Sequence, residues 1–170
     1  MYSVGENVLY GSGGVMRVVD VREENITGEK KNYYVLRAVG AHEDSLTFVP
    51  VDNEKLTSMM YPLMTREELD ALLRRVADED EEEWLTDSRQ RGESFKKIMD
   101  SGDRLKLMRM IRSIRSAAER RSLEGKKNYL SDENAMRKAE RLLYSEFSVV
   151  LGIPEGDVEN FIVKEIERYK

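Results

Sequence analysis

The chain has 170 residues, of which 40% are hydrophobic and 36% charged, and its formal net charge is −5. This length suffices to bury a core in one or two soluble globular domains, and the composition excludes a disordered chain. The sequence contains no cysteine, which excludes disulfide bonds and thiolate zinc sites and fits a reducing cytoplasm. The apolar runs are too short for a transmembrane helix, and residues 1–6 do not resemble a signal peptide. We therefore expect a cytoplasmic protein with no membrane partner.

The first 52 residues have the pattern of short antiparallel strands. β-Branched and aromatic residues gather in four runs, at 8–10, 15–21, 33–36 and 46–49. The glycine-rich segment 11–14 predicts a hairpin turn with positive φ rather than a phosphate loop, because no lysine and helix follow it. Pro50 closes the last run, since proline cannot donate to a central ladder. Four or five such strands predict a small, curled antiparallel barrel.

From residue 66 onwards the apolar residues recur at helical spacing. The clearest stripe is Leu69, Leu72, Leu73 and Val76. Later helices are expected around Phe95, over 103–122, from Ser131 as a capping residue, and after Pro154. The change of pattern between Thr57 and Thr65 predicts an α+β protein of two segregated domains. Residues 1–58 would form the β-barrel, and residues 65–170 an all-helical domain.

Charge is segregated along the chain. Residues 101–127 carry nine lysines and arginines against three carboxylates. On a helical wheel Lys106, Arg109 and Arg112 lie opposite the apolar stripe of this segment. Such a face is either a solvated helix surface or one that contacts nucleic-acid phosphates.

Signals for catalysis are weak. The one histidine, His42, sits in an expected turn, and nothing near it provides a nucleophile or a second metal ligand. The acidic run 78–83 offers carboxylates to a divalent metal, but six adjacent acids are more typical of a solvated, self-repelling segment. We expect no enzymatic activity, no metal and no cofactor.

The one tryptophan, Trp84, follows the acidic run. Its helical spacing to Phe95 and Ile98 favours burial, yet the residues between 86 and 94 supply no apolar side chain. An exposed tryptophan at the start of a polar stretch is instead typical of a binding site. Both interpretations stay open from the residues alone.

Several short motifs resemble the CarD family of bacterial transcription regulators. They are spread over about residues 3–151 and comprise Val4–Tyr10, Gly13–Val15, Ile26–Lys30, Tyr33–Leu36, Val49–Asp52, Trp84, Ser101–Asp103, Leu130–Ser131 and Glu146. The longer tail and the Gly125–Lys127 insertion are similar to Firmicutes-type members. The resemblance implies an amino-terminal Tudor-like domain that binds the β subunit of bacterial RNA polymerase. It also implies a helical domain that meets promoter DNA at the upstream edge of the bubble and stabilises the open complex, and a location at the nucleoid through the polymerase.

The resemblance also assigns residues. Trp84 matches a tryptophan that wedges into the minor groove, where an apolar side chain offsets part of the unstacking cost. The expected contacts to DNA phosphates are Arg89, Arg91, Lys96, Lys97, Arg109, Lys126 and Lys127. The expected polymerase contacts are Glu24, Asn25 and Phe48, although some members have arginine in place of Glu24 and Phe48. With its acidic run, the protein should bind free DNA weakly and lose that binding with added salt.

The main alternative is a module that only binds proteins. In that case the β domain docks on RNA polymerase or another partner, and the helices pack without touching DNA. Reversal of the charges on Lys126, Lys127 and Arg109 would distinguish the two, because only a DNA-binding helical domain needs them.

Overall fold

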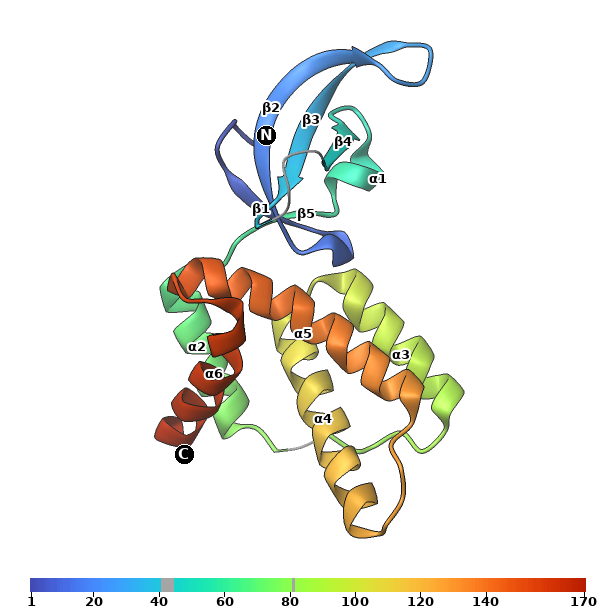
Figure 1. Cartoon of the computed structure of the whole chain (residues 1–170), viewed down its shortest axis with the longest axis vertical. Helices are drawn as coiled ribbons and strands as arrows, with labels where there is room; N and C mark the ends of the chain where they lie inside the picture. Colours follow the sequence, from blue (N-terminus) through green and yellow to red (C-terminus); the bar gives the residue numbers. More distant parts are fainter. Residues whose placement is uncertain (41–44, 81) are drawn as a thin grey trace. The chain divides into compact units, whose positions relative to one another are not determined.

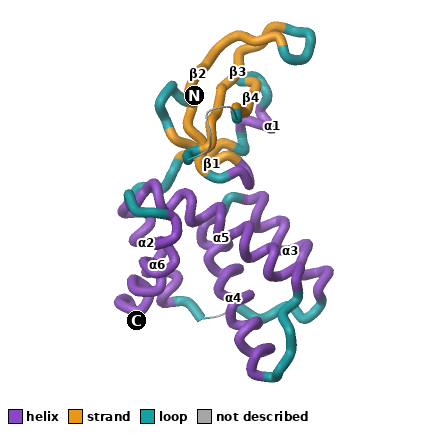
Figure 2. The backbone as a smooth tube through the Cα atoms, in the orientation of Figure 1, coloured by secondary structure: helices purple, strands orange, loops and turns teal. Residues whose placement is uncertain are grey.

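The chain folds into two compact units, Met1–Leu63 and Met64–Lys170. The computed structural model describes residues 1–40, 45–80 and 82–170, so His42 and residue 81 of the acidic run lie outside the described residues. Figure 1 labels the elements, and Figure 2 separates the strands of the first unit from the helices of the second. The α+β layout expected from the sequence is confirmed.

The first unit is built on an antiparallel sheet with the strand order β4-β3-β2-β1-β5. Its strands are β1 (Asn7–Tyr10), β2 (Val15–Asn25), β3 (Lys30–Ala38), β4 (Leu46–Pro50) and β5 (Met60–Pro62). Among the described residues the outer strands β4 and β5 do not pair with each other, so the sheet is open and the expected closed barrel is not confirmed. The short helix α1 (Glu54–Thr57) precedes β5. Pairing of β5 with β1 carries this unit past residue 58, where the sequence analysis ended the first domain.

Buried side chains from alternating strand positions form a hydrophobic core on one face of the sheet. Val8, Val18, Leu36 and Val49 are all fully buried in one cluster. Between β1 and β2 the glycine-rich segment forms a short 3-10 helix, η1 (Gly11–Gly13), and Gly14 has a φ of 82°. The positive φ expected for this segment is therefore present at Gly14. Glycine suits this position because a residue with a side chain would be strained there.

Five helices make up the described part of the second unit. They are α2 (Arg66–Asp78), α3 (Ser88–Ser101), α4 (Arg104–Leu123), α5 (Leu130–Leu151) and α6 (Glu155–Tyr169). The long helix α5 packs against each of the other four, which makes it the centre of the unit. The predicted stripe of α2 is buried along its whole length. Thr65 and Glu68 form a capping box that fixes where α2 begins.

The start of α5 differs from the sequence expectation. Ser131 was expected to cap this helix, but α5 begins at Leu130 and its capping position is Tyr129, which makes no side-chain cap bond. Asp132, in the first turn of α5, is buried. Tertiary contacts with α3 override the local capping preference here.

A buried carboxylate ties the beginning of the helical unit to its centre. Glu146 of α5 is 0% exposed. Its Oε1 accepts a hydrogen bond from the backbone N–H of Met64 at 2.9 Å. Arg104, at the start of α4, donates to both carboxylate oxygens at 2.9 and 3.0 Å. Three segments of the chain therefore meet at one ion pair.

Candidate functional site

Trp84 lies on the irregular segment 82–87, immediately before α3, and is half-buried. Its ring is tilted against Phe95, with 6.4 Å between ring centroids. Full burial would exclude a role as a wedge, and the structure does not show full burial. Trp84 is neither a core residue nor a free surface residue, because one side of its ring is anchored and part of it remains exposed.

The anchor of Trp84 is the guanidinium group of Arg91, whose carbon lies 4.7 Å from the tryptophan ring centroid. Arg91 is 1% exposed and forms a two-pronged ion pair with Asp132, at 2.8 and 3.2 Å. It also donates to the carbonyl oxygens of Leu85 and Thr86, at 2.9 and 3.0 Å. The expectation that Arg91 contacts DNA phosphate is therefore corrected, because its donors are used inside the protein to hold the tryptophan segment.

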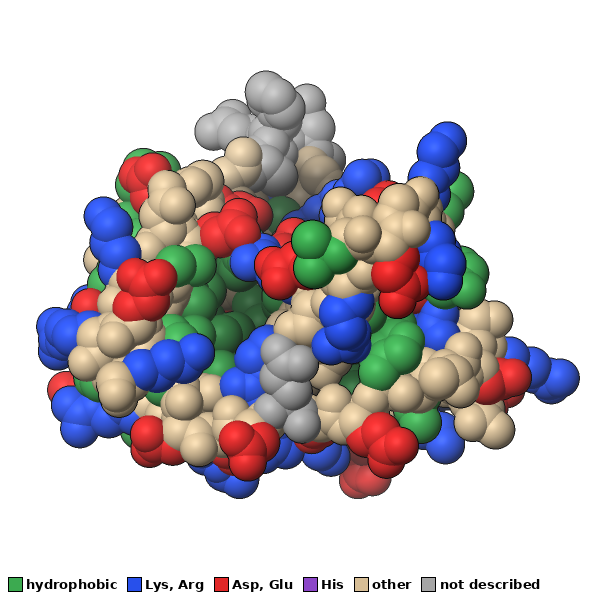
Figure 3. All heavy atoms as spheres, turned by 90° about the horizontal axis from the view of Figure 1, so that it is seen from below, with side chains coloured by type: hydrophobic (Ala, Val, Ile, Leu, Met, Phe, Trp, Pro, Cys, Tyr) green, Lys and Arg blue, Asp and Glu red, His purple; other side chains and the backbone are tan. Residues whose placement is uncertain are grey.

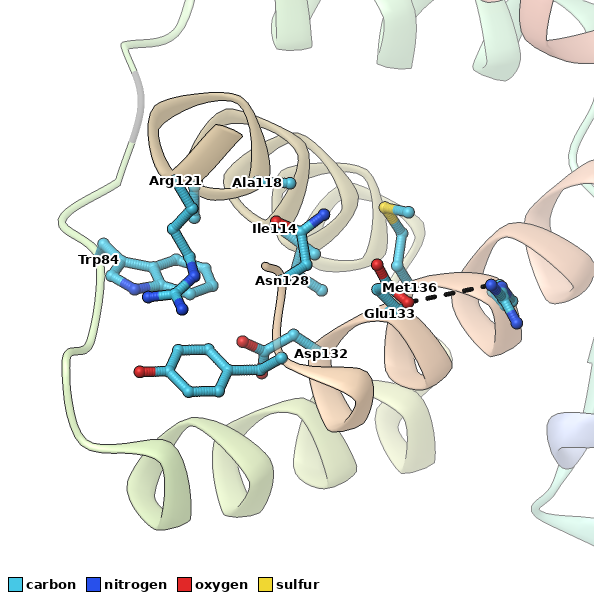
Figure 4. A pocket seen from close by; sticks show the side chains of 11 residues that line it. Trp84, Ile114, Ala118, Arg121, Asn128, Asp132, Glu133 and Met136 are labelled. Atoms are coloured by element: carbon cyan, nitrogen blue, oxygen red, sulfur yellow. Dashed lines mark ion pairs between the residues drawn. The ribbon is translucent and has the colours of Figure 1, made fainter. Parts of the chain in front are cut away.

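Tyr129 connects this anchor to the segment that joins α4 and α5. The guanidinium carbons of Arg91 and Arg121 lie 5.2 and 4.2 Å from its ring centroid. Arg121 also donates two hydrogen bonds to the carbonyl oxygen of Lys127, at 2.7 and 2.9 Å. Figure 4 shows Trp84 and Arg121 side by side at a cavity whose lining also includes Tyr129. The tryptophan segment and the lysine segment are therefore linked through stacked cations and rings.

The sequence analysis missed the residues that make this link. Arg121 was counted only as one charge of a basic segment, and Tyr129 was not selected at all. The sequence did contain one hint of this link, because Tyr129 is an isolated aromatic residue between the lysine pair 126–127 and the start of the next helix. The partner of Asp132 is 41 residues away in the sequence, which local patterns do not report.

The basic face of α4 is largely used for packing. Arg109 forms ion pairs with Glu79 at 2.6 Å and with Glu82 at 3.4 Å. Arg112 donates to the carbonyl oxygens of Val76 and Glu79, at 2.7 and 3.1 Å, where α2 ends. A cation at a helix C-terminus satisfies carbonyls that lack an intrahelical partner. The alternative of a solvated helix surface therefore does not describe these two arginines, and Arg109 already has carboxylate partners.

The four lysines that were expected to contact DNA are all exposed to solvent. Lys96 and Lys97 lie on α3, and Lys126 and Lys127 follow α4. Lys126 pairs with Glu124 at 2.7 Å, while the described residues offer no carboxylate partner to the other three lysines. Arg89 is also exposed and forms a 3.4 Å pair with Glu93 one turn along α3. Figure 3 shows basic and acidic side chains interspersed on its face of the molecule, rather than one continuous basic surface.

Two of the three expected polymerase contacts, Glu24 and Phe48, lie against a residue that the sequence analysis did not select. Arg22 donates to Glu24 at 2.7 Å and to Asp20 at 3.1 Å. Its guanidinium carbon lies 5.9 Å from the ring centroid of Phe48, which comes from β4. Asn25 is exposed at the end of β2. Glu24 and Phe48 therefore lie together on one face of the sheet, with the side chain of Arg22 between them.

The ion pair between α4 and α2 predicts a pH effect on stability. The hydrogen bond from Arg109 lowers the pKa of Glu79 below its ordinary value of 4.5. A carboxylate with a lowered pKa in the folded state stabilises the fold above the ordinary pKa, and this stabilisation disappears as the pH falls through the lower value. The stability advantage of the natural chain over Glu79→Gln should therefore be present at neutral pH and vanish in acid. Urea unfolding across this range measures it, and an advantage that persists in acid would contradict the assignment.

Comparison with protein-family models matches residues 2–64 to the CarD-like/TRCF RID domain. No curated protein matches the chain. The matched range corresponds to the first unit, which carries Arg22, Glu24 and Phe48. Within the described residues, no helix combines the length and apolar character needed to cross a membrane.

Proposed function

We propose that this chain is a CarD-like protein that regulates transcription at promoters, because its residues 2–64 match the RID domain, which is an RNA polymerase-interacting domain. RNA polymerase is its partner. In this proposal the first unit, as a Tudor-like module, binds the β subunit, and the helical unit contacts promoter DNA and stabilises the open complex. The protein acts in the cytoplasm, at the nucleoid, as a binding protein without catalytic activity.

The observation that supports DNA contact is the position of Trp84. A half-exposed tryptophan that is anchored from behind by Arg91 keeps its orientation when it meets a distorted base step. Wedging of apolar side chains between base steps is a known mode of minor-groove binding. The exposed Lys126 and Lys127 are linked to the same site through Arg121, which donates to the Lys127 carbonyl oxygen, and would meet phosphates near the wedge. Phosphate contacts of this kind give affinity without sequence choice.

Polymerase binding is expected to depend on the Phe48 face of the sheet. Phe48→Ser removes the ring that packs edge-on against Tyr33, at 6.3 Å between centroids, and that lies under Arg22. Loss of an aromatic anchor at an interface weakens binding by about tenfold or more. Titration of immobilised RNA polymerase with the full chain measures this. Leu130→Ser, which alters an exposed apolar residue of the helical unit, is the matched control and should bind normally.

DNA contact is tested by charge reversal within the full chain. Lys126→Glu with Lys127→Glu should shorten the lifetime of the open promoter complex by at least tenfold and leave polymerase binding unchanged, because two phosphate contacts become repulsive. Trp84→Ala should shorten the lifetime as well. Lys164→Glu, on α6, is the control for a change of net charge. Unchanged lifetimes for both the lysine and the tryptophan variants would favour a module that binds only protein. The internal pairing of Arg109 and Arg112 is compatible with that alternative as well.

A further inference from the structure

A polar groove of about 310 Å³ lies between α3 and α4. Three cations from the two helices line it, namely Lys97, Lys106 and Arg109. Glu82, on the segment that precedes α3, lines the same groove. Cations that are far apart in the sequence therefore surround a single carboxylate in this hollow.

The guanidinium group of Arg109 is divided between two carboxylates. Its Nε and Nη2 lie 2.7 and 2.6 Å from Oε2 of Glu79, where α2 ends. Its Nη1 lies 3.4 Å from Oε1 of Glu82. The Glu79 side chain is 25% exposed and the Glu82 side chain 59%. The shorter pair therefore fixes the arginine, whereas the longer, exposed pair is weak and leaves Nη1 open to an incoming anion.

The two lysines of the groove also have donors to offer. Lys106 is 57% exposed and lies 4.0 Å from Asp103, and no carboxylate among the described residues pairs with Lys97. The volume of the groove is well above the roughly 30 Å³ that one water molecule occupies in the liquid. A phosphate group with part of its hydration shell therefore fits beside these cations.

We propose that this groove binds a phosphate group of promoter DNA, and that the carboxylate of Glu82 takes the place of that phosphate until DNA displaces it. The inference rests on the proposed function and adds a regulation to it. Carboxylates and phosphates form the same kind of charge-assisted hydrogen bond with arginine. Displacement needs only one exposed side chain to turn away, while Glu79 keeps Arg109 in position. Free DNA is thus bound weakly, and DNA that RNA polymerase already holds displaces Glu82 more readily because its local concentration is high.

Glu82→Gln tests the proposal, because it removes the competing charge with little change in shape. Anisotropy of a short fluorescent duplex DNA, titrated with the full chain at several salt concentrations, gives the affinity. An exposed ion pair corresponds to up to about a fivefold change in an equilibrium constant, so the variant should bind about two- to fivefold more tightly. The slope of log affinity against log salt should steepen by about 0.9, the contribution of one additional phosphate contact.

Glu83→Gln is the matched control, because it removes the same charge from the same acidic run at an exposed residue outside the groove lining. It should raise the affinity less and leave the salt slope unchanged. Lys97→Met, added to Glu82→Gln, should return the affinity toward that of the natural chain, whereas Lys138→Met, at an exposed site on α5, should not. Equal effects of Glu82→Gln and Glu83→Gln on affinity and slope would overturn the proposal.

Inorganic pyrophosphate distinguishes DNA from a free phosphorylated molecule as the source of the phosphate. It is titrated calorimetrically into the natural chain and into the Glu82→Gln chain. If Glu82→Gln tightens the binding of pyrophosphate but not that of duplex DNA, the assignment of the groove to DNA is wrong.

Failure of the groove and failure of the proposed function give different results. If Glu82→Gln behaves like Glu83→Gln while Trp84→Ala shortens the open-complex lifetime, the groove is wrong and promoter contact stands. If Trp84→Ala and the charge reversal of Lys126 and Lys127 leave the lifetime unchanged, promoter contact itself is wrong.

Discussion

Replacement of Arg91 by methionine is expected to destabilise the helical unit by about 3–5 kcal/mol, the usual cost of leaving one partner of a buried ion pair without the other. The pair with Asp132 is buried on both sides, with exposures of 1% and 6%. The variant also removes the donors that hold the carbonyl groups of Leu85 and Thr86, so Trp84 should become more mobile and more exposed. Urea unfolding monitored by tryptophan emission measures both effects, and the folded variant should emit at longer wavelength.

Two further variants test the cause of this loss. Arg89→Met lies on the same helix but removes an exposed pair, so its effect should stay below about 1 kcal/mol. Adding Asp132→Asn to Arg91→Met should recover part of the lost stability, because no unpaired buried charge remains. An Arg91→Met protein that unfolds at the same urea concentration as Arg89→Met would show that the pair does not hold this site.

Glu146→Ala is expected to be comparably destabilising, by about 3–5 kcal/mol. Its carboxylate is fully buried and is the counter-charge of Arg104, which is 16% exposed. The same carboxylate holds the backbone of Met64 at the start of the helical unit. Loss of helical circular dichroism with increasing urea measures the change. Arg104→Ala combined with Glu146→Ala should cost less than the sum of the two single variants, since the two side chains form one unit.

The control for Glu146 is Glu159→Ala. Glu159 is half-exposed and shares Arg115 with Glu140, so Arg115 keeps a partner when Glu159 is removed. We expect a loss below about 1 kcal/mol. If Glu146→Ala and Glu159→Ala lowered the free energy of unfolding equally, burial would add nothing to the contribution of the Glu146–Arg104 ion pair to stability.

Local patterns were sufficient for most of the fold. The stripe of α2 and the interruption at Gly152 and Pro154 each depend on residues a few positions apart, and the structure confirms both. The short strand β5 was missed because Met60–Pro62 has neither alternation nor length, and its pairing with β1 is decided by tertiary structure.

Less of the candidate site could be predicted from the sequence. Charge placed Arg109 and Arg112 on a face that could contact phosphates, although Arg112 caps α2 and Arg109 pairs with Glu79. Arg91 was assigned to DNA through the resemblance, and a sequence does not reveal whether a cation finds an internal carboxylate. Trp84 was left open between core and surface, and its half-buried position explains why the sequence evidence was divided.

The pairing of the first helix of the second unit with its last has a consequence for synthesis. α6 packs against α2, where Arg66 lies 5.4 Å from the ring centroid of Phe161 and Arg74 lies 5.1 Å from that of Tyr169. Chains emerge from the ribosome at roughly 5–20 residues per second, so α2 waits several seconds for its partner. During that interval the sheet of the first unit has all its strands, while apolar positions of α2 such as Leu69 have not met α6. The nascent protein should therefore acquire its polymerase-interacting unit before its helical unit is complete.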